Sequence, residues 1–355
     1  AGPSPVPPRP AARARSTPRP LSDPMTRSRI AAVLLALLTV AAAERSGPEF
    51  ALDPELVARS FRPFEDNVSV RWDDEHFYVE SSGMPRHPMM VGIRAWNGQV
   101  PIPQPYKGNN AFRFTLRPRF AATPVSARET LFRGAIAIAA NGVPIFNPIK
   151  QDGRTDTYLA GELDDFGGHA GRADDYHYHT APVHLADQIG TGLPLAWALD
   201  GFPLFGYIEA DGSAVQGLDW LNGHSGPDGL YHYHASPDYP RVNGGFRGRI
   251  ELREGQVAVQ PRTRAIRPST RPIRGATITH FDNSGEGSYR LELDFRGQRQ
   301  SVSYTLLPAG GAEFLFTDSS GLSRSETYAK RVPRGGRQGR DRGPGNTRPP
   351  QRRGR

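Results

Sequence analysis

Two stretches of this 355-residue chain share an unusual pattern, LDDFGGHAGRADDYHYHTAP at residues 163–182 and LDWLNGHSGPDGLYHYHASP at residues 218–237. They are identical at ten of twenty positions. A further segment precedes each stretch, ANGVPIFNPIKQDG at residues 140–153 and LDGFPLFGYIEADG at residues 199–212. These two segments are identical at six of fourteen positions. Because both segments recur in the same order, the sequence predicts a duplicated unit, with internal repeats at 140–182 and 199–237.

The residues around these motifs favour strands and tight turns. AIAIAANGVPIF (135–146) and LAWALDGFPLF (195–205) place Asn-Gly or Asp-Gly between apolar runs, which is a strong hairpin signal. Alternating apolar residues in NVSVRW (67–72) and FRFTLR (112–117) predict half-buried strands. Only DPELVARSF (53–61) favours a short helix. We therefore expect a mainly β protein whose duplicated hairpin module packs as a β-sandwich- or barrel-like core.

The sequence also predicts where the main domain ends. Residues 50–252 contain both repeats and form the predicted YHYH domain, named here after its Tyr-His-Tyr-His tetrapeptide. Residues 253–274 are rich in Pro and Arg without an apolar period, which is typical of a linker. Alternation returns in residues 275–329 as four segments separated by glycine-containing turns. These segments predict a small C-terminal antiparallel meander.

The N-terminal residues predict export. Residues 1–24 are rich in Pro, Ala and Arg, so we expect a disordered extension that precedes the true start at Met25. Residues 25–43 combine two arginines, an apolar run and three alanines, the pattern of a signal peptide cleaved near Ala43. The apolar run is shorter than the roughly 20 residues of a membrane span. We expect a secreted or periplasmic protein without a transmembrane segment in its mature form.

The charge is divided between the ends and the middle of the chain. The formal net charge is +8, but residues 1–43 carry +5 and residues 330–355 carry +9, which leaves −6 for residues 44–329. The Gly-Arg-Pro tail at 330–355 is typical of a disordered segment. It can contact anionic components of the cell envelope, or it can be a solvated tail without a specific partner. Export argues against nucleic acid as the partner.

The histidines of the repeats form a ligand-like pattern. Successive side chains of a strand point to opposite faces, so His177 and His179 share one face, as do His232 and His234. A third histidine lies eight residues before each pair, in a Gly-His-x-Gly sequence whose glycines allow positive φ or close backbone approach. The candidate metal ligands are therefore His169, His177, His179, His224, His232 and His234.

Three histidines are the ligand number of an open catalytic zinc site. Imidazole also suits copper, nickel and iron, and the chain contains no cysteine. Met84, Met89 and Met90 surround His87 in GMPRHPMM, and thioethers beside imidazole favour copper. Alternatively, these methionines fill the core. We expect a divalent transition metal, zinc or copper; the open alternative is a hydrogen-bonded Tyr-His lattice that only stabilises the fold.

The two repeats differ in their acidic residues. Asp174 and Asp175 of the first repeat align with Gly229 and Leu230 of the second. Carboxylates beside histidine ligands can orient imidazoles or act as general bases. We therefore predict Asp174 and Asp175 as catalytic residues, with the second repeat completing the pocket or holding a structural ion.

A resemblance to a known family is carried by three stretches, GELDDFGGHAGRADDYHYH, LDGFPLFGY and GLYHYHAS. Over residues 85–250 the chain resembles the YHYH domain family, a group of mostly exported bacterial proteins. The resemblance implies the domain and the export, but it implies no reaction.

Motifs for several other activities are absent from the sequence. The chain has no H-E-x-x-H zinc motif, no G-x-S-x-G nucleophile elbow and no phosphate-binding loop, and it lacks a cysteine nucleophile. Two function classes stay open: an extracytoplasmic metalloenzyme, either hydrolase or oxidoreductase, and a metal-binding or structural module without turnover. Whether the protein is an enzyme is not decided by the sequence, and its substrate or ligand is unknown at this stage.

Overall fold

The computed structural model describes residues 49–285 and 287–329, and these form a mainly β fold, as predicted. The strands form several sheets, and no closed barrel occurs among these residues. The predicted extension (1–24), signal peptide (25–43) and basic tail (330–355) lie outside the described residues. Within the described part of the chain, no helix is long and apolar enough to cross a membrane.

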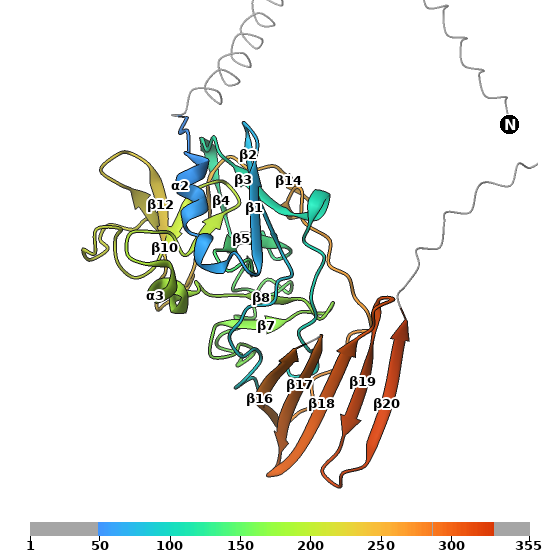
Figure 1. Ribbon diagram of the computed structural model, residues 1–355. Coiled ribbons are helices and arrows are strands. Elements are labelled where there is room, and N and C mark those ends of the chain that lie inside the picture. The colour runs from blue at the N-terminus through green and yellow to red at the C-terminus, as the bar shows by residue number, and fades with distance from the viewer. Residues whose placement is uncertain (1–48, 286, 330–355) are drawn as a thin grey trace, which may run out of the picture. The chain divides into compact units, whose positions relative to one another are not determined.

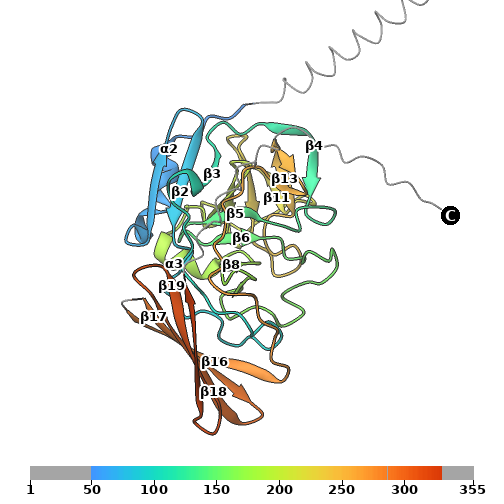
Figure 2. The same cartoon turned by 90° about the vertical axis from the view of Figure 1, so that its right-hand side faces the viewer.

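An eight-stranded sheet contains both repeats and has the order β11-β12-β10-β9-β5-β6-β8-β7. Its two halves follow the same order from the centre outward, because β5 pairs with β9 in the middle. In each half an antiparallel hairpin is followed by the parallel addition of the Tyr-His-Tyr-His strand, β6 with β8 and β10 with β12. Figure 2 shows β5, β6 and β8 side by side. The strands are β5 (Ala135–Ala139), β6 (Pro144–Phe146), β7 (Gly168–Ala170), β8 (Tyr176–Tyr178), β9 (Ala196–Ala198), β10 (Pro203–Phe205), β11 (Gly223–Ser225) and β12 (Tyr231–His234).

The two predicted hairpins are confirmed. Gly142 and Gly201 follow Asn141 and Asp200 in the turns and have φ values of 77° and 92°, a region that glycine enters without steric cost. All five residues of β5 are buried, which explains the continuous apolar run of its sequence. The duplicated strands therefore form the centre of the hydrophobic core.

A second, three-stranded sheet lies beside α2 (Pro54–Arg59) (Figure 1 and Figure 2). Its strands are β1 (Val68–Trp72), β2 (His76–Ser81) and β3 (Phe112–Thr115). The apolar face predicted for FRFTLR is buried, but Trp72, at the end of β1, is 39% exposed rather than on a buried face. The predicted short helix is α2 (Pro54–Arg59), where the Asp53 side chain accepts a hydrogen bond from the Glu55 N–H.

Shorter elements connect these sheets. β4 (Phe120–Ser126) pairs with β13 (Gly245–Gly248), and β14 (Leu252–Arg253) pairs with β15 (Gln256–Val257). The remaining helical elements are α3 (Ala186–Ile189) and the 3₁₀ turns Arg62–Phe64, Gly108–Asn110 and Val183–Leu185.

The predicted C-terminal meander is confirmed as a five-stranded antiparallel sheet (Figure 1). Each strand pairs with the next along the chain, so every connection is local. The strands are β16 (Ala276–Gly285), β17 (Ser288–Phe295), β18 (Gln298–Leu306), β19 (Gly311–Thr317) and β20 (Ser323–Ala329). The domain boundaries proposed from the sequence, 50–252, 253–274 and 275–329, stay predictions.

Candidate metal centres

In each repeat, one β-hairpin brings three histidines together. His169 on β7 lies directly opposite His177 on β8, and His224 on β11 lies directly opposite His232 on β12. Residues directly opposite each other in an antiparallel pair have Cβ atoms about 4.5–5.5 Å apart. The second histidine of each Tyr-His-Tyr-His lies two positions further on and shares the same face. The six predicted ligands therefore form two separate clusters, one near each edge of the eight-stranded sheet.

The first cluster consists of His169, His177 and His179, all of which are buried. The Nε2 atom of His179 lies 3.1 Å from that of His177 and 3.2 Å from that of His169. Zinc–nitrogen bonds of about 2.0–2.1 Å place neighbouring ligands of a tetrahedron about 3.3 Å apart. Both of these distances match the spacing of ligands around one ion, and the ligand atoms of all three histidines lie within 4.8 Å of one another.

The protonation of these imidazoles leaves their Nε2 atoms without hydrogens. Each Nδ1–H donates to a backbone carbonyl: His169 to Glu162 at 3.0 Å, His177 to Asp175 at 2.9 Å and His179 to Asn147 at 2.6 Å. A carbonyl can only accept, so this contact assigns the proton to Nδ1. Burial lowers the pKa of all three histidines, which favours their neutral forms. Three lone pairs therefore face one another with no proton between them.

The second cluster contains a fourth candidate ligand, Glu209, that the sequence did not single out. The Glu209 carboxylate lies 3.0 Å from Nε2 of His224, 3.2 Å from that of His232 and 3.4 Å from that of His234. The Nδ1–H of His234 donates to the Gly206 carbonyl at 3.0 Å, which leaves its Nε2 free to bind a metal. Three imidazoles and one carboxylate form a set of four candidate ligands in this repeat.

The glycines of Gly-His-x-Gly make room for the side chains of the following motif. A Cβ on Gly168 would lie 2.5 Å from the Tyr176 hydroxyl, and one on Gly171 would lie 2.9 Å from Cε1 of His177. Neither glycine has a positive φ, so close approach is the reason for these residues rather than backbone freedom. In the second repeat, Gly223 lies equally close to the Tyr231 hydroxyl.

The tyrosines anchor the opposite face of each Tyr-His-Tyr-His strand. Tyr176 donates to Asp164 at 2.7 Å, and Tyr231 donates to the equivalent Asp219 at 2.9 Å. Asp164 also accepts from the Gly168 N–H at 3.0 Å, so it ties the two strands of the hairpin together. Burial raises the pKa of Asp164 to about 6. The hydrogen bonds of the tyrosines thus hold the strand in place, and the strand positions the histidine side chains on its other face.

The methionines next to His87 do not join either histidine cluster. Met89 and Met90 are fully buried in the hydrophobic core, and the Met90 sulfur accepts a hydrogen bond from the Ala170 N–H at 3.0 Å. His87 instead contacts the Tyr178 hydroxyl through Nε2 at 2.7 Å. The thioethers therefore pack the core, and they give no support to copper as the metal.

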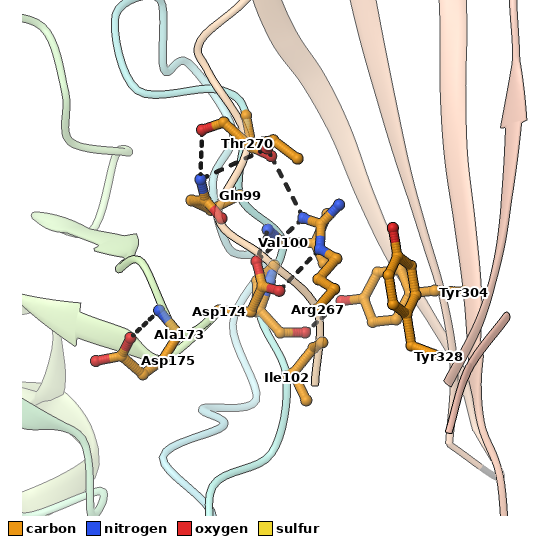
Figure 3. Close-up of polar contacts among 12 residues, drawn as sticks. Gln99, Val100, Ile102, Ala173, Asp174, Asp175, Arg267, Thr270, Tyr304 and Tyr328 are labelled. Carbon is orange, nitrogen blue, oxygen red and sulfur yellow. Dashed lines mark hydrogen bonds and ion pairs between the residues drawn. The ribbon is translucent and has the colours of Figure 1, made fainter. Parts of the chain in front are cut away.

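The two predicted catalytic carboxylates have different surroundings (Figure 3). Arg267 donates to Asp174 from Nε at 2.8 Å and from Nη2 at 3.0 Å, and the Val100 N–H donates to the same carboxylate at 3.1 Å. Both Asp174 and Arg267 are buried. Asp175 accepts from the Ala173 N–H at 3.1 Å, and its other oxygen lies 3.7 Å from Nδ1 of His177. Asp175 is thus the carboxylate beside the first cluster.

The first cluster opens into a cavity of about 260 Å³, and the cavity lining contains all three of its histidines. Aromatic rings cover two of them: Phe146 stacks on His177 with ring centroids 4.1 Å apart, and Trp96 stacks on His169 at 5.8 Å. No residue of the second repeat, 199–237, lines the cavity.

The position equivalent to Glu209 in the first repeat is Lys150. Both segments end in a common Asp-Gly, with Lys150-Gln-Asp-Gly in one and Glu209-Ala-Asp-Gly in the other. Lys150 lines the cavity, and its Nζ donates to the Glu162 carboxylate at 2.8 Å. The repeat alignment could have identified both residues, because it pairs a lysine with a glutamate at one position.

Comparison with known proteins supports the family. The family model described as YHYH protein matches residues 111–216. Residues 111–216 are therefore similar to the YHYH family. The match is narrower than the expected span of 85–250, and it includes the first Tyr-His-Tyr-His motif but not the one at 231–234. Neither a curated protein nor a solved structure matches the chain. The chain is thus similar to a family, and no matching protein describes an activity.

Proposed function

We propose that this protein binds two transition-metal ions, one at each Tyr-His-Tyr-His hairpin, and that the ion in the first repeat is catalytic. The geometry supports a closed four-ligand site in the second repeat, where Glu209 faces all three histidines. The three-histidine cluster of the first repeat keeps a coordination position open toward a cavity. Open positions are typical of catalytic zinc sites, and closed sites are typical of structural ones.

One observation carries this proposal: Nε2 of His179 lies 3.1 and 3.2 Å from the other two Nε2 atoms of the first cluster, while each Nδ1 contacts a backbone carbonyl, which assigns the proton to Nδ1. Lone pairs about 3 Å apart repel in a buried site, where the dielectric constant is low. A cation between them turns this repulsion into attraction. Because each Nδ1–H already binds a carbonyl, the ring orientations are set before the metal arrives.

The ligand sets favour zinc over copper. Imidazole suits both metals. The thioethers that would favour copper are buried in the core, and the second cluster offers a carboxylate instead. When bound at an open three-histidine site, zinc supplies Lewis-acid chemistry and acidifies coordinated water. A hydrolase acting outside the cytoplasm is therefore the proposed class, with the predicted export as part of the proposal; an oxidoreductase is expected instead if the metal is redox-active.

Asp175 and Asp174 take different roles in this proposal. Asp175 lines the cavity and lies beside His177, so it is the candidate for a catalytic carboxylate. Asp174 is engaged by Arg267 and by the Val100 N–H, so we assign it to positioning the loop that precedes β8.

Elemental analysis of the full chain tests the proposal. The protein is produced without a polyhistidine tag, purified without chelators, and compared with His177→Ala/His179→Ala and His232→Ala/His234→Ala variants. We expect two equivalents of metal in the wild type and one in each double variant. His280→Ala is the matched control, because His280 is an exposed histidine outside both clusters. Protein that stays metal-free after reconstitution with zinc would overturn the proposal.

The second candidate is a structural or interaction module without turnover. It is favoured by the hydrogen bonds that tie every tyrosine of the motif to the protein, such as Tyr176 to Asp164 and Tyr233 to Asp200 at 2.7 Å each. In that case the double histidine variants would lose stability, and neither wild type nor variants would hold metal. The same elemental analysis therefore separates the two candidates.

A further inference from the structure

The charge next to the metal cluster is reversed between the two repeats. Lys150 of the first repeat occupies the position of Glu209, whose carboxylate contacts all three histidines of the second cluster. A protonated lysine has three donors and no acceptor, so it cannot serve as a fourth ligand. The first cluster therefore has no carboxylate at this position to contact its Nε2 atoms, as Glu209 does in the second repeat.

Lys150 is held at the cavity rather than turned away from it. Its Nζ donates to Glu162 at 2.8 Å and lies 4.4 Å from the centre of the Trp96 ring. Its ammonium is close enough to His169 and His179 to contribute to the lowering of their pKa values, after the larger effect of burial. The side chain is 28% exposed, so solvent and a ligand can both reach it.

Two arginines add to the positive charge of the cavity. Arg133 and Arg172 line it and are exposed, and no ion pair joins either one to another described residue. In the second repeat, Pro227 replaces Arg172, and the next residue, Asp228, replaces Ala173. Two basic residues of the first repeat, Lys150 and Arg172, thus correspond to Glu209 and Pro227 of the second.

The remaining lining gives the cavity an apolar wall. Trp96, Phe132 and Phe146 line it together with the histidines. Asp175 is the acidic residue of the lining, and it is buried and engaged by the Ala173 N–H. Guanidinium and ammonium groups beside an open coordination position are suited to carboxylate and phosphate oxygens.

We propose that the open site of the first repeat binds a small organic oxyanion, a carboxylate or a phosphate monoester. One oxygen takes the open metal position, Lys150 and Arg172 bind the other oxygens, and the aromatic wall contacts the organic part. This inference rests on the proposed metal in the first cluster. It assigns Lys150 as the residue that changes a closed metal site into a ligand-binding one.

Calorimetric titration of the metal-loaded full chain tests this inference. The probes are phenyl phosphate and benzoate, with benzamide as the neutral control for benzoate. We expect at least one of the two anions to bind and benzamide not to bind. Lys150→Gln is expected to weaken anion binding about tenfold, as the loss of one charge-assisted hydrogen bond does. Whichever anion binds more tightly identifies the class of ligand.

The variants and the metal content keep the outcomes distinct. Lys107→Gln is the matched control, because Lys107 is an exposed lysine outside the cavity. Arg172→Gln is the second variant, since Arg172 is exposed and its loss leaves the packing intact; we expect about threefold weaker binding. Two metal equivalents without anion binding, or with equal binding in Lys150→Gln and Arg172→Gln, would overturn the inference alone. Metal-free wild type would overturn the proposed function as well.

Discussion

The two repeats build the same histidine cluster on the same backbone, but they surround it differently. In both, a histidine on the edge strand lies opposite the first histidine of Tyr-His-Tyr-His, and an aspartate holds the first tyrosine. The first repeat places Lys150 beside its cluster, and the second places Glu209 there. The difference teaches that the hairpin fixes the histidines, whereas one neighbouring position decides whether a carboxylate faces them; in the proposed function, this position makes one metal site open and the other closed.

The hydrogen bonding of the second tyrosine of each motif also differs in direction between the repeats. Asn141 donates to the Tyr178 hydroxyl at 2.9 Å in the first repeat, whereas the equivalent Asp200 accepts from the Tyr233 hydroxyl at 2.7 Å in the second. The Tyr178 hydroxyl is thereby free to donate to Nε2 of His87, 2.7 Å away. The first repeat therefore differs from the second on both faces of its Tyr-His-Tyr-His strand, with Lys150 near the histidines and His87 at the tyrosines.

Exchanging the charges at the distinguishing position is expected to have the largest effect. Glu209→Lys removes the fourth candidate ligand and adds a cation. The metal affinity of the second cluster should therefore fall by more than the roughly 10–100-fold that is typical of changes outside the ligand shell. Lys150→Glu should tighten metal binding at the first cluster and abolish anion binding there. Competition with a chromophoric chelator measures both affinities. Unchanged metal affinity in Glu209→Lys would show that Glu209 is not a ligand.

Breaking the ion pair behind the first cluster is expected to have the next largest effect, on stability. Asp174→Ala leaves Arg267 charged and buried, which costs about 3–5 kcal/mol of unfolding free energy. Asp228→Ala, the matched change in the exposed loop of the second repeat, should cost less than about 0.5 kcal/mol. Urea denaturation measures both. Equal losses in the two variants would contradict the placement of Asp174.

Adding a methyl group at the paired glycines sharpens the comparison further. Gly168→Ala and Gly223→Ala should each cost about 1–3 kcal/mol, because the new Cβ would lie 2.5 Å from a tyrosine hydroxyl in both repeats. Gly171→Ala should cost more than Gly226→Ala, because its nearest neighbours lie at 2.7 and 2.9 Å rather than 3.1 and 3.3 Å. Thermal unfolding of the four variants gives this order, and a reversed order for the second pair would contradict it.

The smallest expected effect is a pH dependence specific to the first repeat. Burial lowers the pKa of His87 and of His184 to about 4 in the folded protein, below their ordinary value of 6.5. The unfolded chain therefore binds more protons between pH 4 and 6.5, and stability falls as the pH falls through this range. His184→Tyr, which copies Tyr239 of the second repeat, should reduce this loss by about 1 kcal/mol, less than the full shift implies because His184 is only partly buried. Urea denaturation of metal-free protein at pH 4.5 and 7 measures it; an unchanged loss would contradict the assignment.

Much of the fold followed from short-range patterns. Asn141-Gly142 and Asp200-Gly201 predicted the two hairpins, and the spacing of His177 and His179 predicted that both point to one face. These features depend on residues close in sequence, where strand and turn geometry alone decide the outcome. The pairing of His169 with His177 also follows from the short connection between β7 and β8.

The parts that sequence reasoning missed depend on distant neighbours. Asp174 was predicted as catalytic because it precedes Tyr-His-Tyr-His, but its partner Arg267 lies 93 residues away in a segment that reads as a linker. Glu209 lies 15 residues before His224 and on another segment, so no local motif connects them. Only the alignment of the repeats, which pairs Glu209 with Lys150, contained this information.

The central claim is that one repeat holds an open metal site and the other a closed one. X-ray absorption spectroscopy at the metal edge tests it most directly, on the full chain with one cluster removed at a time by the double histidine variants. The account predicts three imidazoles and an exchangeable light ligand for the first site, altered by phenyl phosphate or benzoate. It predicts three imidazoles and a carboxylate for the second site, unaltered by either anion. Identical spectra that neither anion changes would contradict the claim.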